Sequence, residues 1–160
     1  MQVLVIYASK TGNTKKLAEA IAAGVREAGD VVCVVKPVAE VTKEDFLQSD
    51  GIIAGSPVYF GSMTAEMKGL FDGFVGIRQK MGDKVGSVFT TSGDPTGGKE
   101  TTMMSMIQAM LIYGMIIVGD PLNATGHYGT ACSGAPDGKA IANGAKQGKR
   151  VAELVKKLKS

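Results

Sequence analysis

The sequence contains few of the residues on which metal centres and acid–base catalysis usually depend. Among its 160 residues there is no tryptophan, one histidine (His127) and two cysteines, Cys33 and Cys132. The cysteines are too far apart in sequence for a metal knuckle, and a single pair makes no disulfide framework. We therefore expect neither a zinc site nor a catalytic triad in which histidine is the base.

The sequence also lacks a hydrophobic run long enough to cross a membrane. The longest apolar stretch, Met110–Val118, is interrupted by Gly114, whereas a spanning helix needs about 18 or more apolar residues in a row. The first residues enter an apolar run directly, without the basic start and cleavage site of a secretory signal. We expect a cytoplasmic protein with no membrane span.

Neither sign of charge predominates strongly, because 18 lysines and arginines against 15 acids give a formal net charge of only +3. The excess of lysine and arginine falls within residues 139–159, where Glu153 is the single acid. Such a stretch is typical of a solvated helix face or of a surface that docks an acidic partner. No aromatic residues are interspersed among these bases, so we expect no nucleic-acid binding.

Glycine is abundant, with 22 of 160 residues, which is about twice its average usage of roughly 7%. Short apolar runs alternate with stretches of helical periodicity, which predicts a single α/β domain over residues 1–160 with helices on both faces of a parallel sheet. The expected strands are Val3–Tyr7, Val31–Val35, Gly51–Gly55, Lys84–Thr90 and Met115–Val118. The expected helices are Asn13–Ala28, Thr42–Gln48, Thr64–Phe74, Lys99–Tyr113 and Asp137–Leu158, with a long glycine-rich loop at Gly119–Pro136.

Open parallel sheets bind ligands beyond the carboxyl ends of their strands, and the loop after the first strand is suited to a phosphate. It consists of Ser9, Lys10, Thr11, Gly12, Asn13 and Thr14. The unpaired N–H groups and positive dipole of the following helix favour an anion, and the hydroxyls add hydrogen-bond donors. The alternative is that Asn13 or Thr14 merely caps the helix. Neither a P-loop nor a Gly-x-Gly-x-x-Gly fingerprint is present, so a mononucleotide phosphate fits best.

The loops after the third and fourth strands supply aromatic and glycine residues at the same edge. The first of these loops contains Pro57, Val58, Tyr59, Phe60 and Gly61, and the second contains Thr91, Ser92, Gly93, Asp94, Gly97 and Gly98. Tyr59 or Phe60 provides a stacking surface for a flat aromatic ligand, or else both rings pack beneath the loop. Asp94 either contributes negative charge near the ligand or caps its own turn.

These motifs resemble a known family. Ser-Lys-Thr-Gly-Asn-Thr is similar to the phosphate loop of flavodoxins, which bind FMN. Residues 55–63, 92–101 and 113–119 resemble the flavin loops and fifth strand of flavodoxin-like NAD(P)H:quinone oxidoreductases of the tryptophan-repressor-binding-protein type. The resemblance implies a three-layer sandwich with five parallel strands in the order 2-1-3-4-5, and FMN as the cofactor held by the three loops. The insertion that this subfamily usually has after its second strand is absent here.

The resemblance implies two possible functions and leaves open whether the chain is an enzyme. The first is that of an electron carrier, a flavodoxin proper, which exchanges electrons with a redox partner protein. The alternative is an NAD(P)H:quinone oxidoreductase that uses the same FMN. His127 either lies on the surface or, as the resemblance suggests, near a neighbouring subunit's flavin. The expected helix Lys99–Tyr113 is apolar on more than one stripe, which favours a homo-oligomer.

Overall fold

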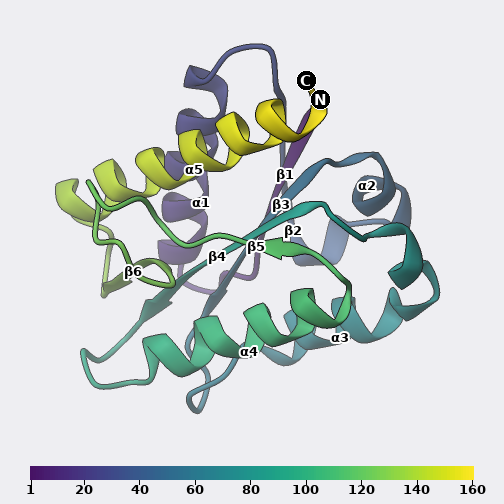
Figure 1. The fold of residues 1–160 in the computed structure, drawn as a ribbon. Coiled ribbons are helices and arrows are strands. Elements are labelled where there is room, and N and C mark those ends of the chain that lie inside the picture. The colour runs from purple at the N-terminus through teal and green to yellow at the C-terminus, as the bar shows by residue number, and fades with distance from the viewer.

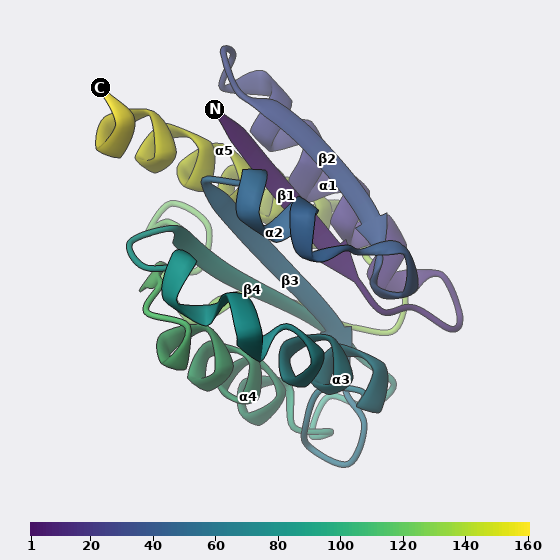
Figure 2. The ribbon, with the colours of Figure 1, turned by 90° about the vertical axis from the view of Figure 1, so that its right-hand side faces the viewer.

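A parallel β-sheet runs through the middle of the protein, with helices on both faces (Figure 1 and Figure 2). The computed structural model describes residues 1–160. The strands are β1 (Gln2–Tyr7), β2 (Val32–Pro37), β3 (Gly51–Pro57), β4 (Val85–Ser92), β5 (Ile116–Ile117) and β6 (Gly129–Ser133). The helices are α1 (Asn13–Glu27), α2 (Lys43–Gln48), α3 (Ala65–Gly73), α4 (Lys99–Ile112) and α5 (Gly138–Lys159), with short 3-10 turns η1 (Val38–Glu40) and η2 (Val75–Lys80).

The order of the strands, β2-β1-β3-β4-β5, confirms the order expected from the sequence. Helices α1 and α5 cover one face of the sheet, and α3 and α4 cover the other, as Figure 1 shows. The two ends of the chain lie close together at the edge where β1 begins, so the carboxyl ends of the strands lie at the opposite edge. No helix is at once long enough and apolar enough to cross a membrane.

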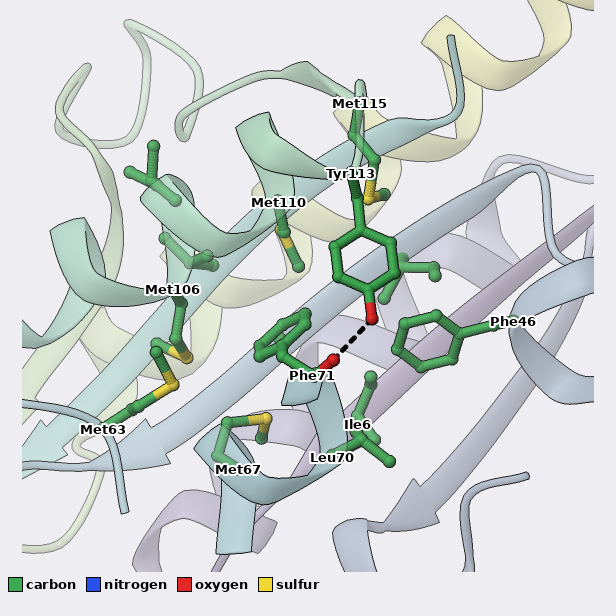
Figure 3. Close-up of a cluster of buried hydrophobic side chains, with 14 of the residues drawn as sticks. Ile6, Phe46, Met63, Met67, Leu70, Phe71, Met106, Met110, Tyr113 and Met115 are labelled. Carbon is green, nitrogen blue, oxygen red and sulfur yellow. Dashed lines mark hydrogen bonds between the residues drawn. The ribbon is translucent and has the colours of Figure 1, made fainter. Parts of the chain in front are cut away.

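The two hydrophobic cores, one on each face of the sheet, differ in composition. Beneath α3 and α4, methionines dominate together with aromatic rings (Figure 3). The hydroxyl of Tyr113 donates a hydrogen bond of 2.6 Å to the carbonyl of Phe71, which ties the end of α4 to α3. Beneath α1 and α5, the core is built from valine, leucine, isoleucine and alanine around Phe89 and contains no methionine. The buried methionines are Met63, Met67, Met81, Met103, Met106, Met110 and Met115.

One part of the expected fold differs from the structure. The expected fifth strand, Met115–Val118, is reduced to the two residues of β5, which pair with Val85 and Gly86 of β4. The expected loop Gly119–Pro136 contains an additional parallel strand, β6, which pairs with the second half of β4 from Val88 to Ser92. The chain therefore leaves the sheet after residue 118 and returns to the same edge, so that the sheet has six strands.

A fully buried glutamine on α5 holds this edge together where the two strands meet. The Gln147 side chain accepts a hydrogen bond from the Thr130 N–H (2.8 Å) and donates to the Ser87 hydroxyl (2.7 Å) and the Val88 carbonyl (2.8 Å). The Ser87 hydroxyl in turn donates to the Val118 carbonyl at 2.8 Å. The backbone groups that the interruption leaves without a strand partner are thus satisfied by two side chains.

Replacing Gln147 with leucine tests this role. The Thr130 N–H and the Val88 carbonyl would lose a buried partner, and each unsatisfied group costs about 1–3 kcal/mol. We expect the free energy of unfolding in urea to fall by about 2–4 kcal/mol. The matched control is Gln108→Leu at an exposed position of α4, which should change stability by less than about 0.5 kcal/mol. Equal stability of the two variants would contradict the role assigned to Gln147.

Candidate functional site

A cleft opens at the carboxyl edge of the sheet, where the loops after β1, β3 and β4 meet. Its volume is about 270 Å³. The structure brings residues of all three expected loops to its wall. The lining residues are Lys10, Thr11, Asn13, Thr14, Pro57, Val58, Tyr59, Thr91, Ser92 and Gly93. The other expected site residues lie in the same loops but outside this wall: Ser9, Gly12, Phe60, Gly61, Asp94, Gly97 and Gly98.

No side chain caps α1 from its capping position, although the Ser9 hydroxyl reaches the first turn from within the loop. Gly12 occupies the capping position in a left-handed conformation (φ 90°), and no side chain bonds to the first turn from that position. The expected alternative, capping by Asn13 or Thr14, is therefore wrong. The Ser9 hydroxyl accepts hydrogen bonds from the N–H groups of Gly12 (3.2 Å) and Lys15 (3.3 Å) from inside the loop.

The charge around this helix terminus is positive. The first turn of α1 contains no acidic residue, although carboxylates are the groups that a helix N-terminus favours. Lys15 and Lys16 follow in the same turns, and Lys10 lies in the preceding loop. The terminus therefore combines free N–H groups, a positive dipole and lysines, which together suit an anionic ligand.

Two hydroxyls join the first loop to the third at the base of the cleft. The Thr14 and Thr91 hydroxyls lie 2.9 Å apart in a buried hydrogen bond that either can donate. A hydroxyl that accepts this bond keeps its own hydrogen free for a further acceptor. One of the two can therefore donate into the cleft while the pair stays intact.

The loop after β3 is a tight hairpin that presents two aromatic rings. The N–H groups of Tyr59 and Ser62 each bond to the other residue's carbonyl at 3.0 Å. The two residues between them, Phe60 (φ 50°) and Gly61 (φ 73°), both have positive φ, as a type I′ turn requires. Phe60 is fully exposed and Tyr59 is 38% exposed. Neither ring packs beneath the loop, so both are available to a ligand or partner.

In the loop after β4, Asp94 caps its own turn. Its carboxylate accepts hydrogen bonds from the Thr96 hydroxyl (2.7 Å) and the Thr96 N–H (2.8 Å). The Thr96 hydroxyl and N–H lower the pKa of the Asp94 carboxyl. Of the two roles expected for Asp94, the capping role is the one that the structure shows.

The second and third loops touch through two glycines. A Cβ atom at Gly98, which begins α4 with φ +97°, would lie 2.9 Å from the Gly61 Cα and 2.9 Å from the Thr101 hydroxyl oxygen. Both the positive φ and this close approach require glycine at position 98. The hairpin is therefore held directly against the start of α4.

Sequence reasoning missed a polar group at the end of β6. The Ser133 hydroxyl lies 3.2 Å from the Ser92 hydroxyl and accepts a hydrogen bond of 2.8 Å from the Lys99 ammonium. Ser133 comes to this position only because β6 pairs with β4, and β6 was not expected. Cys132, next to it, is half-buried, and burial together with the Asp137 carboxylate raises the pKa of its thiol.

A second crevice, of about 290 Å³, lies between α4 and the segment that precedes β6. The buried Asp120 carboxylate holds that segment by accepting from the N–H groups of Thr125 (3.0 Å) and His127 (2.7 Å). The side chains of His127 and Tyr128 are exposed. They line the crevice together with Lys99, Glu100, Met103, Thr125, Gly129 and Ala131.

Comparison with known proteins places the chain in a family. The family model described as NADPH-dependent FMN reductase matches residues 1–130. The chain belongs to this family. Its flavodoxin-like fold is also that of a WrbA-like flavodoxin from Agrobacterium tumefaciens, with a TM-score of 0.85 at 22% identity over 98% of both chains.

Relatives of this FMN reductase family member carry two kinds of name. A protein of Archaeoglobus fulgidus named NAD(P)H dehydrogenase (quinone) is 38% identical over 98% of both chains. A protein of Aquifex aeolicus named flavodoxin is 36% identical over 96% of this chain and 86% of its own length. The structure of an archaeal flavodoxin has a TM-score of 0.83 at 25% identity, over 98% of this chain and 99% of its own. The expectation of a flavodoxin-like FMN family is confirmed.

The contact between the two glycines yields a prediction for this family member. Replacing Gly98 with alanine should lower the free energy of unfolding by at least about 1–2 kcal/mol, the cost of a left-handed backbone. The clash with Gly61 adds to that cost. The control is Gly93→Ala in the same loop, where an added Cβ meets nothing within 4 Å and φ is not positive. If thermal unfolding shows equal losses in both variants, the contact does not hold the loops together.

Proposed function

We propose that this chain binds FMN without a covalent bond in the cleft and transfers electrons through it. The observation that carries the proposal is the acid-free start of α1, with Gly12 at its capping position, facing the same cleft as the exposed ring of Tyr59. One end of the cleft suits a phosphate and the other a flat aromatic ring. When bound, FMN supplies the redox chemistry, and the chain binds and orients it.

Each of the three loops would hold a different part of the ligand. The loop Ser9–Thr14, including Lys10, Thr11, Gly12 and Asn13, would hold the phosphate with N–H groups and hydroxyls. Pro57, Val58, Tyr59, Phe60 and Gly61 would flank the ring, and the Thr91 hydroxyl would stay paired with Thr14. Ser92, Gly93, Asp94, Gly97 and Gly98 would offer backbone groups to the polar edge of the ring. We also propose that residues 1–160 act as one domain in the cytoplasm.

Removing two hydroxyls of the first loop should weaken FMN binding. In a variant with Thr11→Ala and Thr14→Val, each lost hydrogen bond to a phosphate is worth about 1.5–3 kcal/mol, or roughly tenfold or more in affinity. Titration followed by flavin fluorescence measures this for FMN and for riboflavin, which lacks the phosphate. The loss should be large for FMN and small for riboflavin.

A control variant removes a hydroxyl far from the cleft. Ser160 lies at the end of α5, where its hydroxyl bonds only to the Lys157 carbonyl, so Ser160→Ala should bind FMN as the wild type does. Unchanged FMN affinity in the double variant, or equal losses for FMN and riboflavin, would show that the loop Ser9–Thr14 does not bind the phosphate.

A second candidate function is NAD(P)H:quinone oxidoreduction with the same FMN. It is favoured by the relative named NAD(P)H dehydrogenase (quinone), which matches over 98% of both chains. The crevice lined by His127 and Tyr128 also contains Lys99, whose ammonium bonds to Ser133, and it offers space for a further substrate.

An anaerobic assay separates the two functions. If the second function holds, the FMN-loaded protein should oxidise more than one equivalent of NADH or NADPH per FMN only when a quinone is present to accept the electrons. If FMN binds but neither nucleotide is consumed, the chain is an electron carrier that needs a redox partner protein. The expected homo-oligomer stays a prediction, supported by the exposed side chains of Leu111, Ile112 and Leu122 and checked by sedimentation.

A further inference from the structure

Lys10 and Tyr59 reach toward each other from two different loops of the cleft. The Lys10 ammonium lies 5.0 Å from the centroid of the Tyr59 ring, within the range of about 6 Å for a cation–π contact. Both residues line the cleft. The contact therefore spans the cleft from the expected phosphate end to the expected ring end.

The Lys10 ammonium has no carboxylate within salt-bridge distance, since none of the four ion pairs of the structure includes it. The nearby Glu66 carboxyl has its pKa lowered first by its own backbone N–H, then by the Thr64 hydroxyl, and further by the charge of Lys10. The ring of Tyr59 is thus the only group that Lys10 contacts directly as a cation. An exposed cation–π contact is much weaker than a charge-assisted hydrogen bond to a phosphate.

The helix that follows Lys10 begins with further positive charge and no acid. Lys15 and Lys16 lie in the first turns of α1, which contain no acid, so the lysines add to the positive end of the helix dipole. A phosphate dianion in the loop would lie at this positive helix terminus and offer Lys10 a stronger partner than the ring.

We propose that Lys10 has two positions: on the Tyr59 ring in the free protein, and on the phosphate when the ligand is bound. The move releases the ring of Tyr59, which is then free to lie against the flavin. This inference rests on the proposed function, because it takes the loop Ser9–Thr14 as the phosphate site. It makes Lys10 a residue that determines specificity for FMN over riboflavin, since only the phosphate draws it off the ring.

The exchange requires only the two side chains to move, while the backbone of the hairpin stays in place. The backbone of Tyr59 is held by both hydrogen bonds of the hairpin, so the hairpin need not open when the contact breaks. Only the lysine side chain and the torsions of the Tyr59 ring have to change. Both side chains are at least partly exposed, which leaves them room to turn.

The free protein tests the two positions without any flavin. The methylene protons beside the Lys10 ammonium lie near the ring face, so their NMR signals should be shifted upfield by the ring current. Tyr59→Leu should abolish that shift, which assigns it. Adding inorganic phosphate to the wild type should move the signals toward ordinary lysine values. A shift that persists at saturating phosphate would overturn the proposal.

Affinities test the consequence for specificity. Lys10→Met keeps an unbranched side chain of nearly the same length but removes its charge, and we expect about a tenfold loss of FMN affinity, the scale of one charge-assisted contact. Riboflavin affinity should stay unchanged or rise, because the ring of Tyr59 is no longer held. The control is Lys157→Met on an exposed site at the far end of α5, which should change neither affinity.

The outcomes distinguish this inference from the proposed function. If the wild type binds neither flavin, the proposed function fails. If the wild type binds FMN and Lys10→Met binds it equally well, or loses FMN and riboflavin affinity alike, only the role of Lys10 fails. Circular dichroism of the variant shows whether it is folded. If it is not, Lys10→Gln is measured in its place, with the same expectations.

Discussion

The register of three parallel strands determines everything found at the carboxyl edge of the protein. Tyr7 of β1 pairs with Gly55 of β3, and Pro57 of β3 pairs with Thr91 of β4. The pairing continues beyond the strands, because the Ala8 N–H bonds to the Gly55 carbonyl (3.0 Å) and the Val58 N–H to the Thr91 carbonyl (2.8 Å). A slip of one residue would turn every side chain to the other face. The three loops could not then form this cleft.

Small residues allow the sheet and its loops to approach as closely as this register demands. A Cβ at Gly55 would lie 2.0 Å from the Phe89 ring, which packs directly over the backbone of β3. At the cleft, Gly98 lets the start of α4 touch the hairpin. Phe60 is the exception, since a bulky side chain with φ 50° is strained and its ring is fully exposed. Burial does not explain that ring, which lies on the hairpin but outside the wall of the cleft.

The sequence predicts the elements whose signals are local and fails where stability comes from distant residues. The short helix α2 is predicted with its cap because Thr42 and Asp45 form a capping box. Strand β6 is missed because Gly129–Ser133 has almost no apolar pattern, and its hydrogen bonds depend on Gln147 of a later helix. Because β6 is missed, the sequence does not predict that Ser133 lies near the cleft loops. The alternative to the phosphate loop, capping by Asn13 or Thr14, fails because Gly12 occupies the capping position and Ser9 reaches the first turn instead.

The two faces of the sheet differ in how closely they are packed, and the difference follows the two ends of the cleft. On the α1 and α5 face, backbones meet directly: a Cβ at Gly24 would lie 1.8 Å from the Ala145 carbonyl oxygen, and one at Gly148 would lie 1.9 Å from that of Ile21. Such close packing leaves α1 little freedom, and α1 begins at the expected phosphate loop. On the other face, the hairpin and the start of α4 rest on Met63, Met103 and their methionine neighbours, whose unbranched side chains adapt to small shifts. The chain thus places the charged end of its proposed ligand on the closely packed layer and the ring on the methionine-rich one.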